Sequence, residues 1–216
     1  TLDVTTTLTL NNGTISGNLT GAAAATKDNN TTVTISGNNV LTGTTLNREG
    51  ILSLDFASSN NNNSKISTGN LTMGSTTAND TTAITNLLSN SAGPSLQTVA
   101  NLAVAGGPSQ INLTSNGGQD MTLAITGTLT RTAGTLNLGI PSADTIVAYT
   151  GATTNTNGTV GAWLTVNDTD YATISGGQII AATYTSQNNV ALWGTNQNIT
   201  NSAGFTGTVG DCNTIN

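Results

Sequence analysis

The feature that most constrains this chain is a short recurring phrase in which Leu, Ile or Val alternates with Thr before a Gly or Asn. It occurs as TISGNLTG (14–21), TISGNNVLTG (34–43), KISTGNLTMG (65–74) and AITGTLTRTAGTLNLG (124–139). Such alternation is the pattern of a β-strand, and Gly and Asn suit the positive-φ corners between strands. The Ser-Gly pairs of the first two phrases lie 20 residues apart. A degenerate period near 20 is typical of the coils of a β-solenoid.

The composition favours a narrow interior. Aromatic residues make up only 3% of the chain, whereas Thr is about a fifth of it and Asn about a seventh. A wide core would lack large side chains to fill it, but Val, Leu, Ile, Ala and Thr suffice for a solenoid. We therefore predict an all-β fold, a β-solenoid (parallel β-helix-like) of short strands. A β-sandwich of short strands is the alternative.

Two segments are expected along the chain. Residues 1–133 read as degenerate β-strand-repeat coils, with a looped insertion near 79–107 that contains a candidate helical turn at Ala83–Leu88. Residues 134–216 contain six of the seven aromatic residues, which we expect to fill a wider part of the core. These residues are Tyr149, Trp163, Tyr171, Tyr184, Trp193 and Phe205.

Charge and cysteine content exclude several classes of protein. The chain has ten acidic residues, four basic residues and no His, for a net charge of −6. Its scattered Lys and Arg residues make nucleic acid an unsuitable partner, because phosphate binding needs clustered cations. No apolar run approaches the length of a membrane span, and no signal peptide is visible. A lone cysteine, Cys212, rules out an internal disulfide framework. This composition fits an exported bacterial surface protein.

The segment GTVGAWLTVNDTDYATISGGQIIAATYT (158–185) carries a resemblance. A Gly-small-Trp motif (161–163), an Asp-aromatic-Ala triplet (170–172) and a Gly-Gly turn (176–177) precede a strand-like stretch (179–184). In this order they resemble the autotransporter-associated β-strand repeat family of large bacterial surface and passenger proteins. The resemblance covers about 134–216, and the chain stops at CNTIN (212–216) as though inside a following repeat. It implies a β-helical scaffold or adhesin.

One group of residues is a weak candidate for a metal site. Asn167, Asp168 and Asp170 are close in sequence, and hard cations such as Ca²⁺ take oxygen ligands. The alternative, which we favour, is a turn in which Asn167 and Asp168 bond to nearby backbone. We expect no cofactor.

Two other functions are possible for such a scaffold. A polysaccharide-active β-helix enzyme would need carboxylates to converge on one groove, drawn from Asp55, Asp80, Asp120, Asp144 and Asp168. A carbohydrate- or ice-binding module would need Thr-x-Thr triplets or aromatic side chains in register on one exposed face. The triplets are found at 7–9, 32–34, 126–132 and 183–185. Without His and with few bases, an enzyme is disfavoured, so we expect no catalytic residues.

The expected function is therefore a non-enzymatic structural or adhesive segment of a secreted bacterial cell-surface protein. Uncapped solenoid ends favour stacking on further coils. We expect the partner to be the chain itself, as a homopolymer or as flanking repeats of the same protein, with surface glycans as a further partner class. Cys212 and both termini are the candidate assembly sites.

Overall fold

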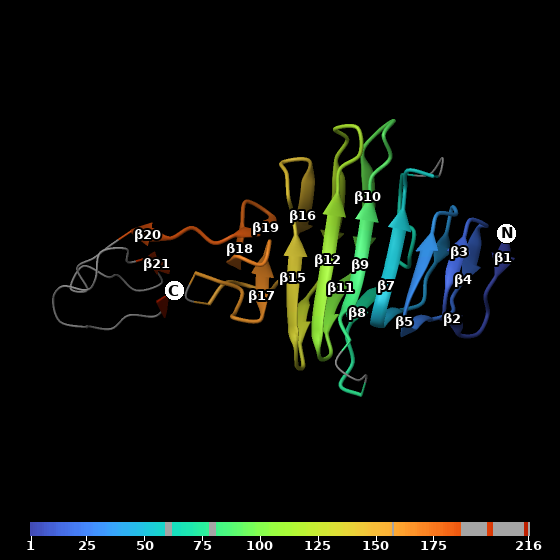
Figure 1. The fold of residues 1–216 in the computed structure, drawn as a ribbon, viewed down its shortest axis with the longest axis horizontal. Coiled ribbons are helices and arrows are strands. Elements are labelled where there is room, and N and C mark those ends of the chain that lie inside the picture. Colours follow the sequence, from blue (N-terminus) through green and yellow to red (C-terminus); the bar gives the residue numbers. More distant parts are fainter. Residues whose placement is uncertain (59–61, 78–80, 157, 187–197, 201–213, 216) are drawn as a thin grey trace.

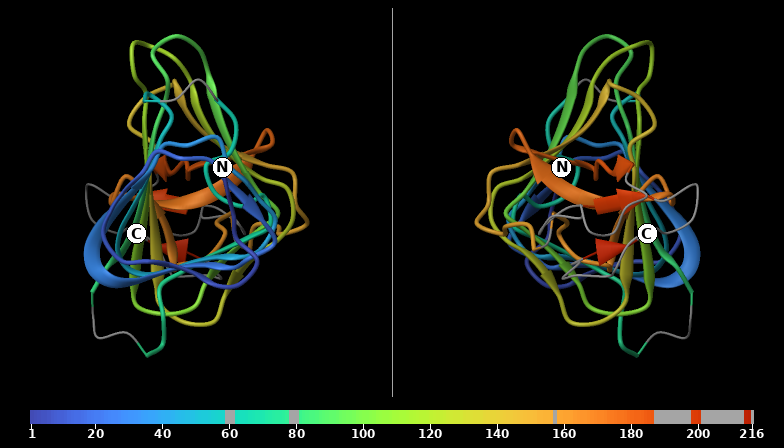
Figure 2. Two further views of the ribbon diagram at one scale, coloured as in Figure 1. Left: turned by 90° about the vertical axis from the view of Figure 1, so that its right-hand side faces the viewer. Right: turned by 90° about the vertical axis from the view of Figure 1, so that its left-hand side faces the viewer.

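The structure is a computed structural model that describes residues 1–58, 62–77, 81–156, 158–186, 198–200 and 214–215. The chain winds in successive coils along one axis from the N-terminal to the C-terminal end (Figure 1). Viewed along that axis, the coils lie over one another around a common interior (Figure 2). Nearly all neighbouring strands are parallel. The predicted β-solenoid is confirmed, and the β-sandwich alternative is wrong.

Each coil contributes strands to three faces, which follow one another in chain order. Face 1 consists of β1 (Leu2–Asp3), β4 (Leu19–Gly21), β6 (Val40–Leu41), β10 (Ser95–Val99), β13 (Met121–Ile125) and β16 (Thr145–Tyr149). Face 2 consists of β2 (Leu8–Leu10), the first parts of β5 (Ala25–Ile35) and β7 (Thr45–Asp55), β8 (Asn70–Met73), β11 (Asn101–Val104) and β14 (Leu129–Arg131). Face 3 consists of β3 (Gly13–Ile15), the last parts of β5 and β7, β9 (Ala83–Leu88), β12 (Pro108–Thr114), β15 (Thr135–Gly139) and β17 (Leu164–Val166).

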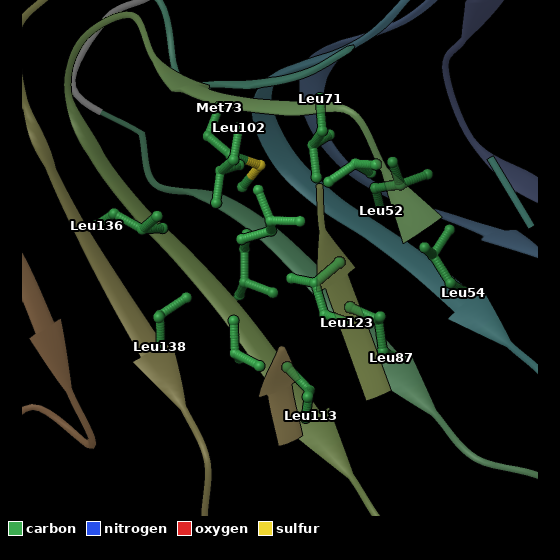
Figure 3. Close-up of a cluster of buried hydrophobic side chains, with 14 of the residues drawn as sticks. Leu52, Leu54, Leu71, Met73, Leu87, Leu102, Leu113, Leu123, Leu136 and Leu138 are labelled. Atoms are coloured by element: carbon green, nitrogen blue, oxygen red, sulfur yellow. The ribbon is translucent and has the colours of Figure 1, made fainter. Parts of the chain in front are cut away.

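The apolar half of each strand's alternation points into the solenoid. One large cluster of buried side chains runs from Leu10 to Ile179 and receives residues from all three faces. Figure 3 shows a section of this cluster that includes Leu123 of face 1, Leu102 of face 2 and Leu113 of face 3. A second, smaller cluster near the N-terminal end consists of Val4, Leu19, Ala23 and Leu41. Burial of these side chains is the main force that holds the coils together.

Coil length differs from the period expected from the sequence. Residues that face each other on neighbouring coils are 17 apart at Asp3 and Thr20, but 31 apart at Asn70 and Asn101. Only the first coils come close to the predicted period of 20. The additional residues lie partly in longer strands, since β10 has five residues and β6 only two, and partly in the corners between faces (Figure 2).

Glycine allows tight packing at these corners. Gly74 takes a φ of 73°, and a Cβ at this position would come within 1.8 Å of the Gly106 carbonyl oxygen on the next coil. Any other residue there would clash with the backbone of the neighbouring coil.

The region near 79–107 follows the regular path of the solenoid wherever it is described. It contains β9, β10 and β11, one strand for each of three faces. The candidate helical turn at Ala83–Leu88 is wrong, because this segment is strand β9 and pairs with both β7 and β12. Its side chains alternate between buried and half-buried positions, which is the period of a strand. The ladder also continues from β12 to β15 across residues 133 and 134, and the predicted division there stays a prediction.

Strand pairing changes from parallel to antiparallel in the C-terminal part of the ladder. Strand β18 (Asp170–Ser175) runs antiparallel to β17, and β19 (Gln178–Ala181) runs antiparallel to both β18 and β16. Beyond it, β20 (Thr185–Ser186), β21 (Asn198–Thr200) and β22 (Thr214–Ile215) form a separate parallel sheet. No helix in the described part of the chain has the length and apolarity of a membrane span.

Candidate functional site

The outward positions of face 3 form ladders of polar side chains. One rank, set by strand register, runs from Thr14 through Thr34 and Ser53 to Asn86 and Asn112. Within it, the Asn112 side-chain amide donates to Asn86 Oδ1 at 3.0 Å. Such bonds between identical positions fix the outward side chains of neighbouring coils in one orientation.

Face 2 carries a similar ladder. The amide of Asn101 donates to Asn70 Oδ1 at 2.7 Å, and the Thr128 hydroxyl donates to Asn101 Oδ1 at 2.9 Å. These groups are exposed or half-buried, so they present ordered hydroxyl and amide groups to any ligand along the solenoid axis.

Amide side chains also replace strand backbone where the ladder is interrupted. The stretch 62–67 lies between β6 and β10 on face 1 without forming a regular strand. There, buried Gln97 accepts from the Lys65 backbone N–H at 2.8 Å, and buried Asn39 donates to the Lys65 carbonyl at 2.7 Å. Asn39 Oδ1 accepts from the Leu19 N–H at 2.9 Å, so this residue joins three successive coils. These bonds satisfy backbone groups that would otherwise be buried unpaired.

Both lysines of the chain have fully buried side chains. Lys65 Nζ lies 3.3 Å from the Gly37 carbonyl oxygen and 5.0 Å from the centre of the Phe56 ring. Burial lowers the pKa of Lys65 to about 8, against the attraction of the Asp55 carboxylate. Removal from water disfavours the charged amine, and the carbonyl and the ring partly compensate.

Lys27 is placed in the same way at another corner. Its Nζ donates to Asn29 Oδ1 at 2.6 Å and to the Glu49 carbonyl at 3.3 Å. Burial lowers its pKa, while the carboxylates of Glu49 and Asp28 act to raise it. Neither lysine was predicted from the sequence to have a structural role. Strand alternation predicts a buried side chain at Lys27, and this signal could have revealed its place in the core.

The calcium candidates lie in the turn between β17 and β18. Asn167 and Asp168 take φ values of 54° and 57°, a conformation that Asn and Asp tolerate better than most residues. Asn167 Oδ1 accepts from the Ile140 N–H at 2.7 Å, and its amide donates to the Ile140 carbonyl at 3.1 Å. One carboxylate oxygen of Asp170 accepts from the Thr169 hydroxyl at 3.0 Å.

In this turn, the side-chain amide of Asn167 bonds to the backbone of Ile140 in the way that the backbone of a neighbouring strand would. Among the described residues, no three His, Cys, Asp or Glu side chains lie together as a metal-binding group. Calcium binding at Asn167, Asp168 and Asp170 stays a prediction.

The motif that carries the resemblance forms the antiparallel hairpin. Gly161 takes a φ of 147°, and a Cβ there would lie 2.8 Å from Trp163 Nε1, so the indole occupies the space that a side chain would need. Gly176 and Gly177 both have positive φ and connect the paired residues Ser175 and Gln178. This is the backbone geometry of a two-residue hairpin turn.

The aromatic residues divide between core and periphery. Tyr149 is buried in the large cluster, and half-buried Trp163 packs against it. Tyr171 and Tyr184 are half-buried, and the Tyr184 hydroxyl accepts from the Tyr171 N–H at 3.2 Å. Trp193 and Phe205 lie outside the described residues, as does Cys212.

The carboxylates considered for an enzyme are spread along the solenoid. Asp120 and Asp144 directly precede β13 and β16 and so lie one coil apart at the same edge of face 1. Asp55 ends β7, several coils nearer the N-terminal end, and Asp168 lies in the turn after β17. Asp80 is outside the described residues.

The Thr-x-Thr triplets occupy different faces. Thr9 is on face 2, where it pairs with Thr26, whereas Thr34 is on face 3. Thr130 is on face 2, but several coils away from Thr9, and it pairs with Ala103. The described triplets therefore do not stack into one continuous array.

Comparison with known proteins gives one informative similarity. The chain is 32% identical over 177 residues to the adhesin BmaC autotransporter of Brucella suis biovar 1 (strain 1330). The match covers 78% of this chain and 5% of that protein, so the chain spans a small part of its relative's length. No family model and no solved structure matches the chain.

The similarity extends well beyond the hairpin motif, because it covers most of the solenoid. The resemblance to large bacterial autotransporter proteins is thus confirmed as homology over most of the sequence. This chain is a distant homologue of a segment of a bacterial autotransporter adhesin, built as a mainly parallel β-solenoid.

Proposed function

We propose that the chain is a non-enzymatic structural and adhesive segment of a bacterial cell-surface passenger protein. The homology to an autotransporter adhesin carries this proposal. An autotransporter passenger is displayed outside the outer membrane, so the chain would be exposed at the cell surface.

The described architecture supports a mechanical role. Each coil contacts mainly its neighbours, so length is gained by adding coils. Parallel ladders satisfy the backbone, and the Asn and Thr ladders place polar groups on parts of faces 2 and 3. A segment of this kind would hold an adhesive surface away from the cell.

Exposed proteins also need resistance to proteases, and the cation placement supports this. Both lysines are fully buried. Arg48 forms an ion pair with Asp28 at 3.1 Å, and the Arg131 guanidinium donates to the Gly134 carbonyl at 2.7 Å. Proteases that cut after Lys or Arg would have few accessible sites.

Surface exposure is tested by labelling intact source cells with fluorescent antibodies against this segment. Intact cells should be labelled, while antibodies against a cytoplasmic control protein should label only permeabilised cells. Labelling of this segment that appears only after permeabilisation would contradict the proposal.

Adhesion is tested with beads that carry the purified chain. They should attach to mammalian cells more strongly than beads that carry a Leu123→Asp variant, which cannot bury its charged side chain. Equal attachment would limit the proposal to a structural role.

The carbohydrate- or ice-binding module stays an alternative proposal. Glycan-array binding or thermal hysteresis by the purified chain would favour it.

A further inference from the structure

Face 1 differs from the other two faces in the large apolar side chains that it exposes to solvent. Among the described residues, the large apolar side chains with the highest exposure are Leu2 (59%), Val40 (66%), Leu96 (37%) and Ile180 (37%). Val40 and Leu96 point outward from face 1, and Ile180 lies on β19, which extends this face by pairing with β16. Leu2 is exposed at the open N-terminal end of the solenoid, where it pairs with the buried Leu19. An apolar surface that is exposed in register over several strands marks an interaction site more often than scattered residues do.

The apolar positions form a rank at the C-terminal half of this face. Register aligns Leu96 with Thr122 and Thr122 with Ile146, and the antiparallel pairing of Ala148 with Gln178 brings Ile180 beside Ile146. We call these four outward residues, Leu96, Thr122, Ile146 and Ile180, the apolar rank. The next outward rank consists of Thr98, Ala124 and Ala148, whose side chains are all smaller than those of Leu and Ile.

A hollow deepens this surface. It has a volume of about 290 Å³ and lies where the rank ends, between the Ile140–Thr145 corner and β19. Ile140, Ile146 and Ile180 line it together with Asn167 at the β17–β18 turn. An apolar side chain from a facing molecule would fit such a space.

The charge distribution indicates which partner can approach. The four strands β10, β13, β16 and β19 contain no charged residue, although the chain carries a net charge of −6. A second copy can therefore meet this surface without bringing like charges into contact. A basic or acidic partner would find no charge there to pair with.

The same distribution also selects an orientation. Asp120 and Asp144 form an acidic edge where β13 and β16 begin, and the opposite edge, at Thr126 and Thr150, is uncharged. A two-fold axis along the solenoid makes facing strands antiparallel, so each acidic edge meets the partner's uncharged edge. A two-fold axis along the strands would place both acidic edges together, which like-charge repulsion disfavours.

We propose that two copies of this chain pair side by side through the apolar rank, with their solenoid axes parallel. The inference rests on the proposed function in one respect: passengers anchored in the same outer membrane present their axes in the same direction. Ranks parallel to the axis then pack beside one another along the whole face, as in packed β-sheets. Pairing would stiffen the displayed segments laterally.

The first test is the molar mass of the purified 216-residue chain, measured by sedimentation across a concentration series. The wild type should form a reversible dimer, and Ile146→Glu should raise the dimer dissociation constant at least tenfold. Ile51→Glu is the matched control, because Ile51 is a half-buried outward residue of face 3. A monomer at every concentration, or an equal effect of the two substitutions, would overturn the pairing.

The second test fixes the orientation and does not depend on a charged substitution. Leu96→Cys and Ile180→Cys, each combined with Cys212→Ser, lie at opposite ends of the rank. With parallel axes, each variant should form disulfide-linked dimers alone under mild oxidation. Cross-linking only in a mixture of the two would show the opposite orientation, and none at all would contradict pairing.

These tests separate the inference from the proposed function. A monomeric chain that antibodies detect on intact cells would overturn the pairing alone. A paired chain that is absent from the cell surface would overturn the proposed function alone.

Discussion

The N-terminal coils and the central coils follow the same path with different interiors. On face 1, β4 and β6 have three and two residues, whereas β10, β13 and β16 have five each. The short strands contribute one inward apolar residue each, Leu19 and Leu41, to a small cluster. Strand β13 alone contributes Met121, Leu123 and Ile125 to the large one.

Long polar side chains fill part of the interior of the first coils. Lys27, Asn39, Asn47 and Lys65 are buried there and bond to corner backbone or to neighbouring coils. The comparison shows that a solenoid coil can be closed by hydrogen-bonded polar groups where its strands are too short for apolar packing. Such groups stabilise less than apolar burial of the same volume, but they specify the corner conformation.

The largest expected effect comes from a cavity in the central core. Leu123→Ala should lower the free energy of unfolding by about 2–5 kcal/mol, because a buried Leu leaves both lost contacts and a void. Leu41→Ala, in the small cluster, should cost about 2 kcal/mol or less. Urea unfolding measures both, and equal losses would remove the distinction between the two interiors.

The second effect is a pH dependence that originates in the N-terminal coils. The pKa of Lys65 is about 8 in the folded chain, below its ordinary value of 10.5. Between these values the unfolded chain binds more protons, so the free energy of unfolding should rise with pH, by at most about 1.4 kcal/mol per unit. Below pH 8 the amine is charged in both states, and this contribution becomes constant.

Lys65→Met is the control for this pH dependence. Denaturation at several pH values between 8 and 10.5 should give a smaller slope for the variant than for the wild type. The slope that remains includes Lys27, whose pKa is lowered in the same direction. Identical slopes would show that Lys65 keeps an ordinary pKa.

A third effect extends the comparison to the hairpin, where an amide replaces a strand. Asn167→Ala removes both bonds to Ile140 and places at positive φ a residue that tolerates this conformation less well than Asn, so it should cost about 1–3 kcal/mol. Asn167→Gly removes the same bonds but tolerates the backbone conformation, so it should cost less. If thermal or urea denaturation shows Gly to be as costly as Ala, the backbone conformation contributes nothing.

The smallest effect is expected on the outward ladders. Thr34→Ser keeps the hydroxyl on face 3 and should change the free energy of unfolding by no more than about 0.5 kcal/mol. A loss comparable to that of Leu41→Ala would show that outward methyl groups support the coils as strongly as the small N-terminal cluster does.

Much of the fold was predictable, but the candidate site was predictable only in part. The alternation in TVTI (32–35) predicted a strand with one buried face, and residues 32–35 lie in β5 with Val33 and Ile35 buried. The helix expected at Ala83–Leu88 was wrong because short apolar runs fit both periods, and pairing with β7 and β12 decided between them. The turn at Asn167 was predicted, but its bonds to Ile140 were not.

The sequence by itself determined the all-β class, the inward and outward sides of each strand, and the relationship to an autotransporter adhesin. These properties depend on alternation, which has a period of two residues, and on local motifs, which span a few residues. Only the tertiary structure decided which residues meet across coils. Register depends on the number of residues in each corner, and that number varies without a local pattern. For this reason the burial of Lys65, the bonds of Asn39 to the coils on either side and the alignment of Leu96 with Ile146 could be found only in the folded chain.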